Sequence, residues 1–203
     1  MARIALVLAH PDPAPERLCR ALADSYEGAA LRAGHDVRRI DLAALDFPLL
    51  RSQREQETTP LPDALAPAQA TLGWAEHLVL VFPLWLGGMP ALLKGFLEQV
   101  LRPGFAYRIE GRGWTRGLKG KSARIVVTMG MPAIAYRLFF GAFALRGLKR
   151  SILGFCGVSP IRTTLLGGVA TASPEKRQGW LRKMAELGAA ARQTARCPPP
   201  TQS

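Results

Sequence analysis

The apolar positions of this chain form short runs that alternate with segments of helical periodicity. Three runs, residues 4–9, 78–83 and 123–129, lack polar alternation, which is typical of strands buried on both faces of a parallel sheet. Runs 37–42 and 158–166 are mixed in pattern, and the second contains Pro160, so we expect both at sheet edges. Helical spacing follows in residues 18–29, 64–74, 92–101, 136–155 and 180–187.

Strands that alternate with helices in this way predict an α/β fold. We expect a doubly wound, five-stranded parallel sheet in the order 2-1-3-4-5 with helices on both faces. Ligands of such sheets bind beyond the carboxyl ends of the strands, which here lead into residues 10–17, 83–89 and 128–136. Residues 43–62 show no period and are expected to form a long surface loop.

The stretch from residue 78 to residue 107 is the most informative part of the chain. Gly87 and Gly88 follow Trp85 and allow the backbone to turn sharply beside a flat ligand, and Pro90 occupies a first helical position. The sequence PLWLGGMPALLKGFLEQVLRPGFAY resembles the signature of the flavin-dependent NAD(P)H:quinone reductases with a flavodoxin-like fold, the DT-diaphorase type. The likeness extends more thinly from the first strand to about Pro174.

The resemblance implies an enzyme that passes hydride from NADH or NADPH through a bound flavin, FMN or FAD, to a quinone or a similar flat acceptor. His10 matches the family's histidine after the first strand. Residues 14–16 lack the hydroxyl group with which the family holds the phosphate, and Arg17 could replace that donor. Tyr136 matches a substrate-facing tyrosine and is the candidate catalytic residue, although the histidine that follows it in the family is absent.

Two further loops supply the remaining candidate cofactor contacts. Side chains and amides of the second loop suit the flavin rings, and amides of the third would stabilise negative charge on the reduced flavin. The residues concerned are Pro83, Leu84, Trp85, Leu86, Gly87, Thr128, Met129 and Gly130. No motif indicates a metal site.

Composition is consistent with one globular domain, residues 1–195, followed by a disordered tail at residues 196–203. The three cysteines are widely spaced and form no CxxC pair, which favours a reducing cytoplasm. No apolar segment is long enough to span a membrane, so we expect no stable membrane insertion. The resemblance also implies a homodimer with the site near its interface.

The formal net charge of +12 leaves two other classes of function open. A basic cluster in residues 108–124 could bind nucleic acid or an anionic surface, but no nucleic-acid motif accompanies it, and attraction of the NAD(P)H phosphates explains it as well. Its members are Arg108, Arg112, Arg116, Lys119, Lys121 and Arg124. The other alternative is a flavodoxin-like regulatory subunit of a membrane transporter. Residues 136–155 could lie on a membrane, although burial in the core or a subunit interface is favoured.

Overall fold

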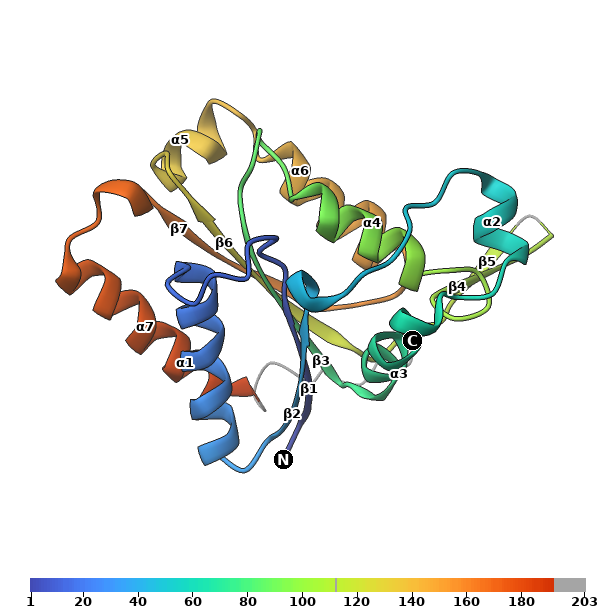
Figure 1. Ribbon diagram of the computed structural model, residues 1–203, viewed down its shortest axis with the longest axis horizontal. Coiled ribbons are helices and arrows are strands. Elements are labelled where there is room, and N and C mark those ends of the chain that lie inside the picture. Colours follow the sequence, from blue (N-terminus) through green and yellow to red (C-terminus); the bar gives the residue numbers. More distant parts are fainter. Residues whose placement is uncertain (112, 192–203) are drawn as a thin grey trace, which may run out of the picture.

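The computed structural model describes residues 1–111 and 113–191 of the chain. Its centre is a parallel sheet of five strands in the order β2-β1-β3-β6-β7, which confirms the expected topology (Figure 1). The strands are β1 (Arg3–Leu8), β2 (Asp36–Asp41), β3 (His77–Pro83), β6 (Ser122–Met129) and β7 (Ile161–Gly167). The two mixed runs are the edge strands, and the last begins after Pro160, which has no N–H to donate to the sheet.

Helices cover both faces of the sheet and divide the core into two clusters. Every residue of β3 and of β6 is buried, because each strand packs against helices on both sides. One cluster lies under α1 (Leu18–Arg32) and α7 (Pro174–Ala189). The other lies under α3 (Ala66–Trp74), α4 (Ala91–Val100), α5 (Ala133–Leu138), α6 (Phe143–Gly147) and the π-helical η3 (Leu148–Gly154).

The segment expected as one helix over residues 136–155 is divided. Helix α5 ends at Leu138, and the chain then turns at Gly141 and Ala142, which both have positive φ (58° and 48°). A right-handed helix cannot continue through two residues of this conformation. Helix α6 and η3 follow as a second, continuous helical segment.

Two other segments are more ordered than the sequence indicated. The expected surface loop at residues 43–62 contains α2 (Gln53–Thr58). Residues of the basic cluster form a hairpin, in which β4 (Tyr107–Glu110) pairs antiparallel with β5 (Gly113–Arg116). Short 3₁₀ turns complete the chain at η1 (Leu42–Ala44), η2 (Asp63–Leu65) and η4 (Val169–Thr171).

Within the part of the chain that the structure describes, no helix combines the length and the apolar character needed to cross a membrane. Residues 196–203, expected to form a tail, lie outside the described residues.

Candidate active site

The carboxyl ends of β1, β3 and β6 bring the three expected loops together at one edge of the sheet. The N–H of Ala9 donates to the carbonyl oxygen of Val81 (2.8 Å), and the N–H of Leu84 donates to that of Thr128 (2.7 Å). The rings of His10 and Trp85 meet edge to face, with centroids 5.8 Å apart. These contacts fix the first loop against the second and the second against the third.

His10 is held in its neutral form in the first loop. Its Nδ1 accepts a hydrogen bond from the N–H of Asp12 (3.1 Å), which leaves Nε2 as the donor of the ring. Burial lowers the pKa of His10 below its ordinary value, so the ring carries no charge at neutral pH. His10 therefore offers one N–H donor and the flat face of its ring beside Trp85.

Arg17, the second candidate of this loop, is engaged by a neighbour. Its Nε donates to Asp12 Oδ2 (2.7 Å), and Nη2 lies 2.5 Å from the same oxygen. Bonds from the Ala14 N–H and from Arg17 lower the pKa of Asp12, so its carboxylate stays ionised. Because both side chains are about 40% exposed (43% and 37%), this ion pair is weak and a phosphate could compete for the guanidinium.

The first turn of α1 suits an anion. Arg17 is the N-cap residue, but no side chain caps the helix and its first turn carries no acidic residue. The first amides of a helix have no partner within the helix, and its dipole places partial positive charge there. This 15-residue helix thus presents unfilled donors at the loop edge.

The second loop is a tight turn that projects from the sheet. Trp85 and Gly88 exchange two backbone hydrogen bonds, at 3.0 and 2.9 Å. Between them Leu86 is fully exposed and has a φ of 46°, a conformation that costs a non-glycine residue about 1–2 kcal/mol. Trp85 is half exposed, whereas Pro83 is buried and Leu84 is partly buried. The accessible part of this loop is therefore Trp85, Leu86 and Gly87.

The candidate positions of the third loop, residues 128–130, offer backbone and not side chains. The hydroxyl of Thr128 lies 3.3 Å from the Sγ of Cys19 in the interior, and Met129 is buried. Gly130 is exposed, has ordinary φ, and a Cβ built there would meet nothing within 4 Å. Nothing in the chain itself requires a glycine at this position, whereas the close approach of a flat ligand would.

Tyr136 is not placed as expected for a substrate-facing tyrosine. Its side chain is 2% exposed, and its hydroxyl makes no hydrogen bond of good geometry within the described residues. It borders a small interior gap shared with Leu84, Met89 and Leu145. Burial raises the pKa of this phenol, opposed by the nearby backbone of Leu145. The helical turn that begins at Ala133 directs the ring inward, so the hydroxyl does not face the three loops' open side.

Sequence reasoning did not identify Asp12 or Cys19, which position Arg17 and Thr128. Asp12 lies between two prolines, and a short acidic residue there accepts a bond from the backbone two residues on, here Ala14. That signal was available in the sequence. The Cys19–Thr128 contact joins residues far apart in the chain and left no local pattern.

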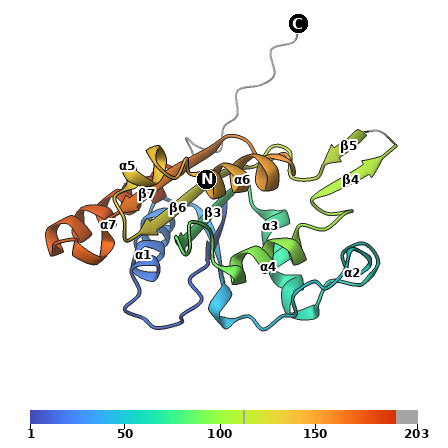
Figure 2. The same cartoon turned by 90° about the horizontal axis from the view of Figure 1, so that it is seen from above.

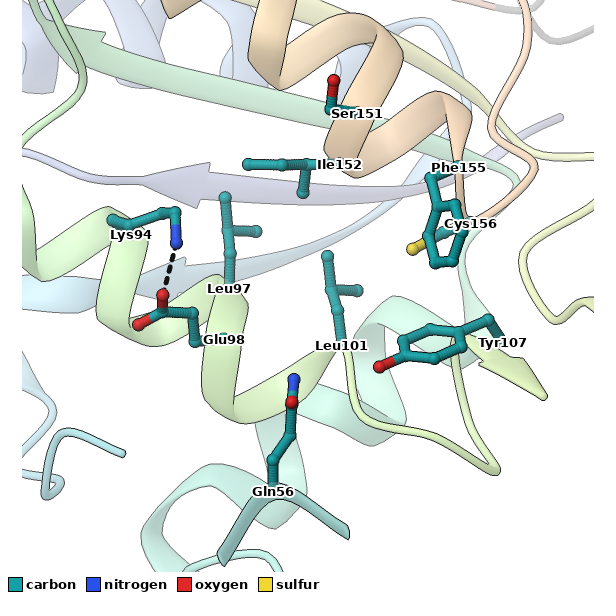
Figure 3. Close-up of a pocket in the computed structure, with 10 residues that line it drawn as sticks. All are labelled: Gln56, Lys94, Leu97, Glu98, Leu101, Tyr107, Ser151, Ile152, Phe155 and Cys156. Atoms are coloured by element: carbon teal, nitrogen blue, oxygen red, sulfur yellow. Dashed lines mark hydrogen bonds and ion pairs between the residues drawn. The ribbon is translucent and has the colours of Figure 1, made fainter. Parts of the chain in front are cut away.

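A separate hollow of about 190 Å³ lies between α4, η3 and the hairpin, and none of its lining residues belongs to the three loops (Figure 3). The ion pair of Lys94 and Glu98 borders one side, and the rings of Tyr107 and Phe155 border another. It is therefore not a continuation of the candidate active site.

The described members of the basic cluster are divided by the fold and lie away from the three loops, while Arg112 lies outside the described residues. Lys121 Nζ donates to the carbonyl oxygens of Gly73 (2.6 Å) and Ala75 (2.5 Å), and buried Arg124 donates to Thr164 (3.2 Å). These two cations hydrogen-bond to groups of the chain itself at the amino ends of the strands. Arg108 and Arg116 are exposed on the hairpin beyond the far end of α4.

Comparison with known proteins agrees with the observed fold. A profile of the flavodoxin-like fold family matches residues 2–187. An NAD(P)H oxidoreductase from Haemophilus influenzae is 28% identical over 185 residues, 89% of this chain and 91% of that protein. An FMN-dependent NADH:quinone oxidoreductase from a Jannaschia species is 32% identical over 112 residues, 55% of this chain and 54% of that protein, so the match spans about half its length.

Among solved structures, a protein from Streptococcus mutans has a TM-score of 0.77 at 29% identity, and the match covers 92% of this chain and 98% of the other. The family match thus extends over nearly all the described residues, and the strand order is the one the family requires. The chain therefore belongs to the flavodoxin-like fold family, and it is an oxidoreductase that resembles the family's NAD(P)H:quinone reductases.

Proposed function

We propose that the chain binds a flavin at the three loops and uses it to transfer electrons from NAD(P)H to a quinone or a similar flat acceptor. The observation that carries the proposal is the convergence of these loops, joined by the Leu84–Thr128 hydrogen bond and the His10–Trp85 contact. The relatives named for NAD(P)H and FMN support it.

The residues present fit a flavin. The open amides of the first turn of α1 would hold its phosphate, with Arg17 released from Asp12 as a further donor. Trp85 and Leu86 offer apolar surface to the rings, while Gly87 and Gly130 leave room for their edge. Backbone N–H groups of residues 128–130 would favour negative charge on the reduced cofactor.

When bound, the flavin supplies the redox chemistry, and the protein binds, orients and shields it. His10, held neutral, keeps a donor beside Trp85 without adding charge to the loop edge. Because the Tyr136 hydroxyl is buried, this residue is not assigned as a proton donor to the acceptor. The homodimer implied by the resemblance remains part of the proposal, without an assigned interface.

Flavin titration tests this proposal independently of turnover. We expect FMN to quench its fluorescence on binding the purified chain at micromolar concentration or below. Riboflavin, which lacks the phosphate, should bind at least about tenfold more weakly if α1 holds that group. FAD in a parallel titration distinguishes the two cofactors. Anaerobic NADH or NADPH should then bleach the bound flavin, and a quinone should restore its absorbance.

Gly130→Val tests the position of the site by structural means, and a second glycine serves as its control. The position has ordinary φ and open space, so valine leaves the fold intact while its side chain occupies the flavin's approach. Gly179→Val on α7 is the matched variant, since a side chain there also has room and the helix is not part of the three loops. Equal FMN affinity in both variants, or no flavin binding by the unmodified chain, would refute the site.

A further inference from the structure

Two arginines lie side by side on the face of the sheet that α1 and α7 cover. Arg124 of β6 and Arg162 of β7 are partners in the parallel register, and partner residues of neighbouring strands project to the same face. Val126 and Leu166 follow them at even spacing and belong to the core cluster under α1 and α7. Figure 2 shows these two helices on one side of the sheet, with α3 and α4 on the other. The two cations therefore share the amino-terminal end of this face.

Arg124 is a buried cation that no side-chain carboxylate neutralises. It is 6% exposed, its Nη1 donates to the hydroxyl of Thr164 (3.2 Å), and its Nε is buried without a hydrogen-bond partner. Among the ion pairs of the described residues, none includes Arg124 or Arg162. The residues outside the described part of the chain contain no aspartate or glutamate. Because a buried charge is costly unless it is paired, the guanidinium favours an anion from solvent.

Two neighbouring side chains also keep a buried polar atom without a partner. Tyr26 of α1 and His77 of β3 are both fully buried, and neither the Tyr26 hydroxyl nor His77 Nε2 makes a hydrogen bond in the structure. Burial raises the pKa of Tyr26, and the charge of Arg124 opposes this effect. Burial, together with the charges of Arg124 and Arg162, lowers the pKa of His77 to about 4. Arg124 is thus close enough to act on both side chains, in a region of positive potential.

The contact of Cys19 with Thr128 places Tyr26 over Arg124. Cys19 Sγ on α1 lies 3.3 Å from the hydroxyl of Thr128 at the carboxyl end of β6. From there, α1 returns toward the amino ends of the strands. Tyr26 comes seven residues after Cys19, about 10 Å along the helix, and Arg124 four residues before Thr128, about 13 Å along the strand. Both steps keep the same face, so the phenol and the guanidinium meet between helix and sheet.

We propose that Arg124 Nε, Tyr26 Oη and His77 Nε2 bind one chloride ion. With the hydroxyl proton of Ser122 directed at His77 Nδ1 (2.8 Å), all three atoms present a hydrogen to the ion. Their burial favours an occupant of the size of a single atom or a water molecule. A water molecule would satisfy the three donors but leave the guanidinium unpaired, whereas chloride neutralises it and lessens its repulsion with Arg162. The ion would fasten α1 to β6 at a second point, away from the three loops.

Thermal unfolding of the full-length chain in sodium chloride and in sodium gluconate tests the binding at equal ionic strength and pH 7. Gluconate is too large for a buried site of this size. Chloride at about ten times its dissociation constant should shift the folding equilibrium about elevenfold, which raises the Tm by about 3–6 °C for a chain of this length. Bromide should act like chloride, and its anomalous diffraction from a soaked crystal should place one ion against the three donor atoms.

Matched variants separate this site from a general effect of salt. Arg124→Met removes the charge at similar length and should give the same Tm in both salts. Tyr26→Phe keeps the ring and removes one donor, so it should weaken chloride binding about tenfold or more. Arg102→Met is the control: Arg102 is as buried as Arg124, but its guanidinium donates to the carbonyl oxygens of Gln99 and Thr59 and to the Gln99 side chain. This variant should keep the full response to chloride.

Three results would overturn the proposal. One is an equal Tm of the unmodified chain in chloride and gluconate, which would assign the three donors to water. Another is an unchanged response to chloride in both Arg124→Met and Tyr26→Phe, which would place the ion elsewhere. The third is a bromide ion found only at other positions. If Arg124→Met fails to fold, Tyr26→Phe decides, because its ring still fills the core. Failure of the chain to bind FMN would refute the proposed function and leave the chloride site intact.

Discussion

His77 is a buried titratable group at the first position of β3, at the opposite end of that strand from the candidate active site. It is 1% exposed, and its Nδ1 lies 2.8 Å from the hydroxyl of Ser122 on the neighbouring strand. Burial, with the charge of Arg124, lowers its pKa to about 4. The folded protein therefore holds this imidazole neutral across the range in which an exposed histidine takes up a proton.

We expect His77 to make the fold sensitive to acid. In the unfolded chain a histidine binds its proton below about pH 6.5, whereas the folded chain does so only near pH 4, so this contribution to stability is complete above pH 6.5 and is lost as the pH falls toward 4. At pH 5 the loss amounts to about 2 kcal/mol. Denaturant unfolding of the wild type and of His77→Gln at pH 7 and pH 5 measures it. A loss of equal size in both proteins would assign the effect to other groups.

Tyr136 matches a substrate-facing tyrosine of the family in sequence, but its side chain lies in the interior. Because its hydroxyl is buried without a hydrogen bond of good geometry, Tyr136→Phe should change the free energy of unfolding by less than about 1 kcal/mol. Both half-reactions should keep their rates within about twofold in stopped-flow experiments, since a hydrogen bond to charge developing on the acceptor is worth about 1.5–3 kcal/mol. A tenfold slower oxidative half-reaction would show that the ring turns outward when the acceptor binds.

At the scale of helices and strands, the elements predicted from the sequence were those with a clear local pattern of apolar residues. Strands β1, β3 and β6 were identified because their burial on both faces leaves an uninterrupted apolar run. Helix α2 was missed although Ser52 accepts from the N–H of Glu55 (3.2 Å) and Glu55 accepts from the N–H of Arg51 (2.8 Å). The S-x-x-E spacing of such a cap was present, but the helix is exposed and has no apolar stripe to reveal it.

The hairpin and the break after α5 were hidden for other physical reasons. Seven of the eight residues in β4 and β5 are exposed, so no buried face imposes an alternation of apolar and polar residues. The attachment of the hairpin to the rest of the chain depends on the packing of Trp114 and Tyr107 against Phe155, which is remote in sequence. The break depends on the left-handed conformation of Ala142, a residue that by itself favours helix. Such tertiary effects leave little trace in a single sequence.

The candidate site was predictable as a set of loops but not as a set of side chains. Topology alone places residues 10–17, 83–89 and 128–136 at one edge. Which atoms face outward depends on packing: Thr128 and Tyr136 turn inward, while Trp85 and Gly130 stay accessible. A family motif conveys the first kind of information more securely than the second.

At the scale of the whole molecule, the cations of the hairpin and the candidate site lie at different ends. The hairpin cations stand beyond the amino ends of the strands, and β6, with eight residues, spans about 23 Å between that end and the loops. This is more than twice the screening length of about 8 Å at physiological salt. The expectation that the cluster at residues 108–124 speeds capture of NAD(P)H therefore finds no support in the geometry of a single chain.

Arg108→Glu with Arg116→Glu tests this separation. We expect the KM for NADPH and the limiting rate with a water-soluble quinone to change less than about twofold at 0.15 M salt, because the reversed charges are screened from the loops. Arg17→Glu, which reverses a charge inside the first loop, should instead weaken FMN binding measured by fluorescence quenching. Steady-state kinetics at low and physiological salt provide the comparison. A large rise in the KM of the hairpin variant at both salt concentrations would mean that the hairpin reaches a dinucleotide site, which one chain of this shape does not allow and a second copy would have to supply.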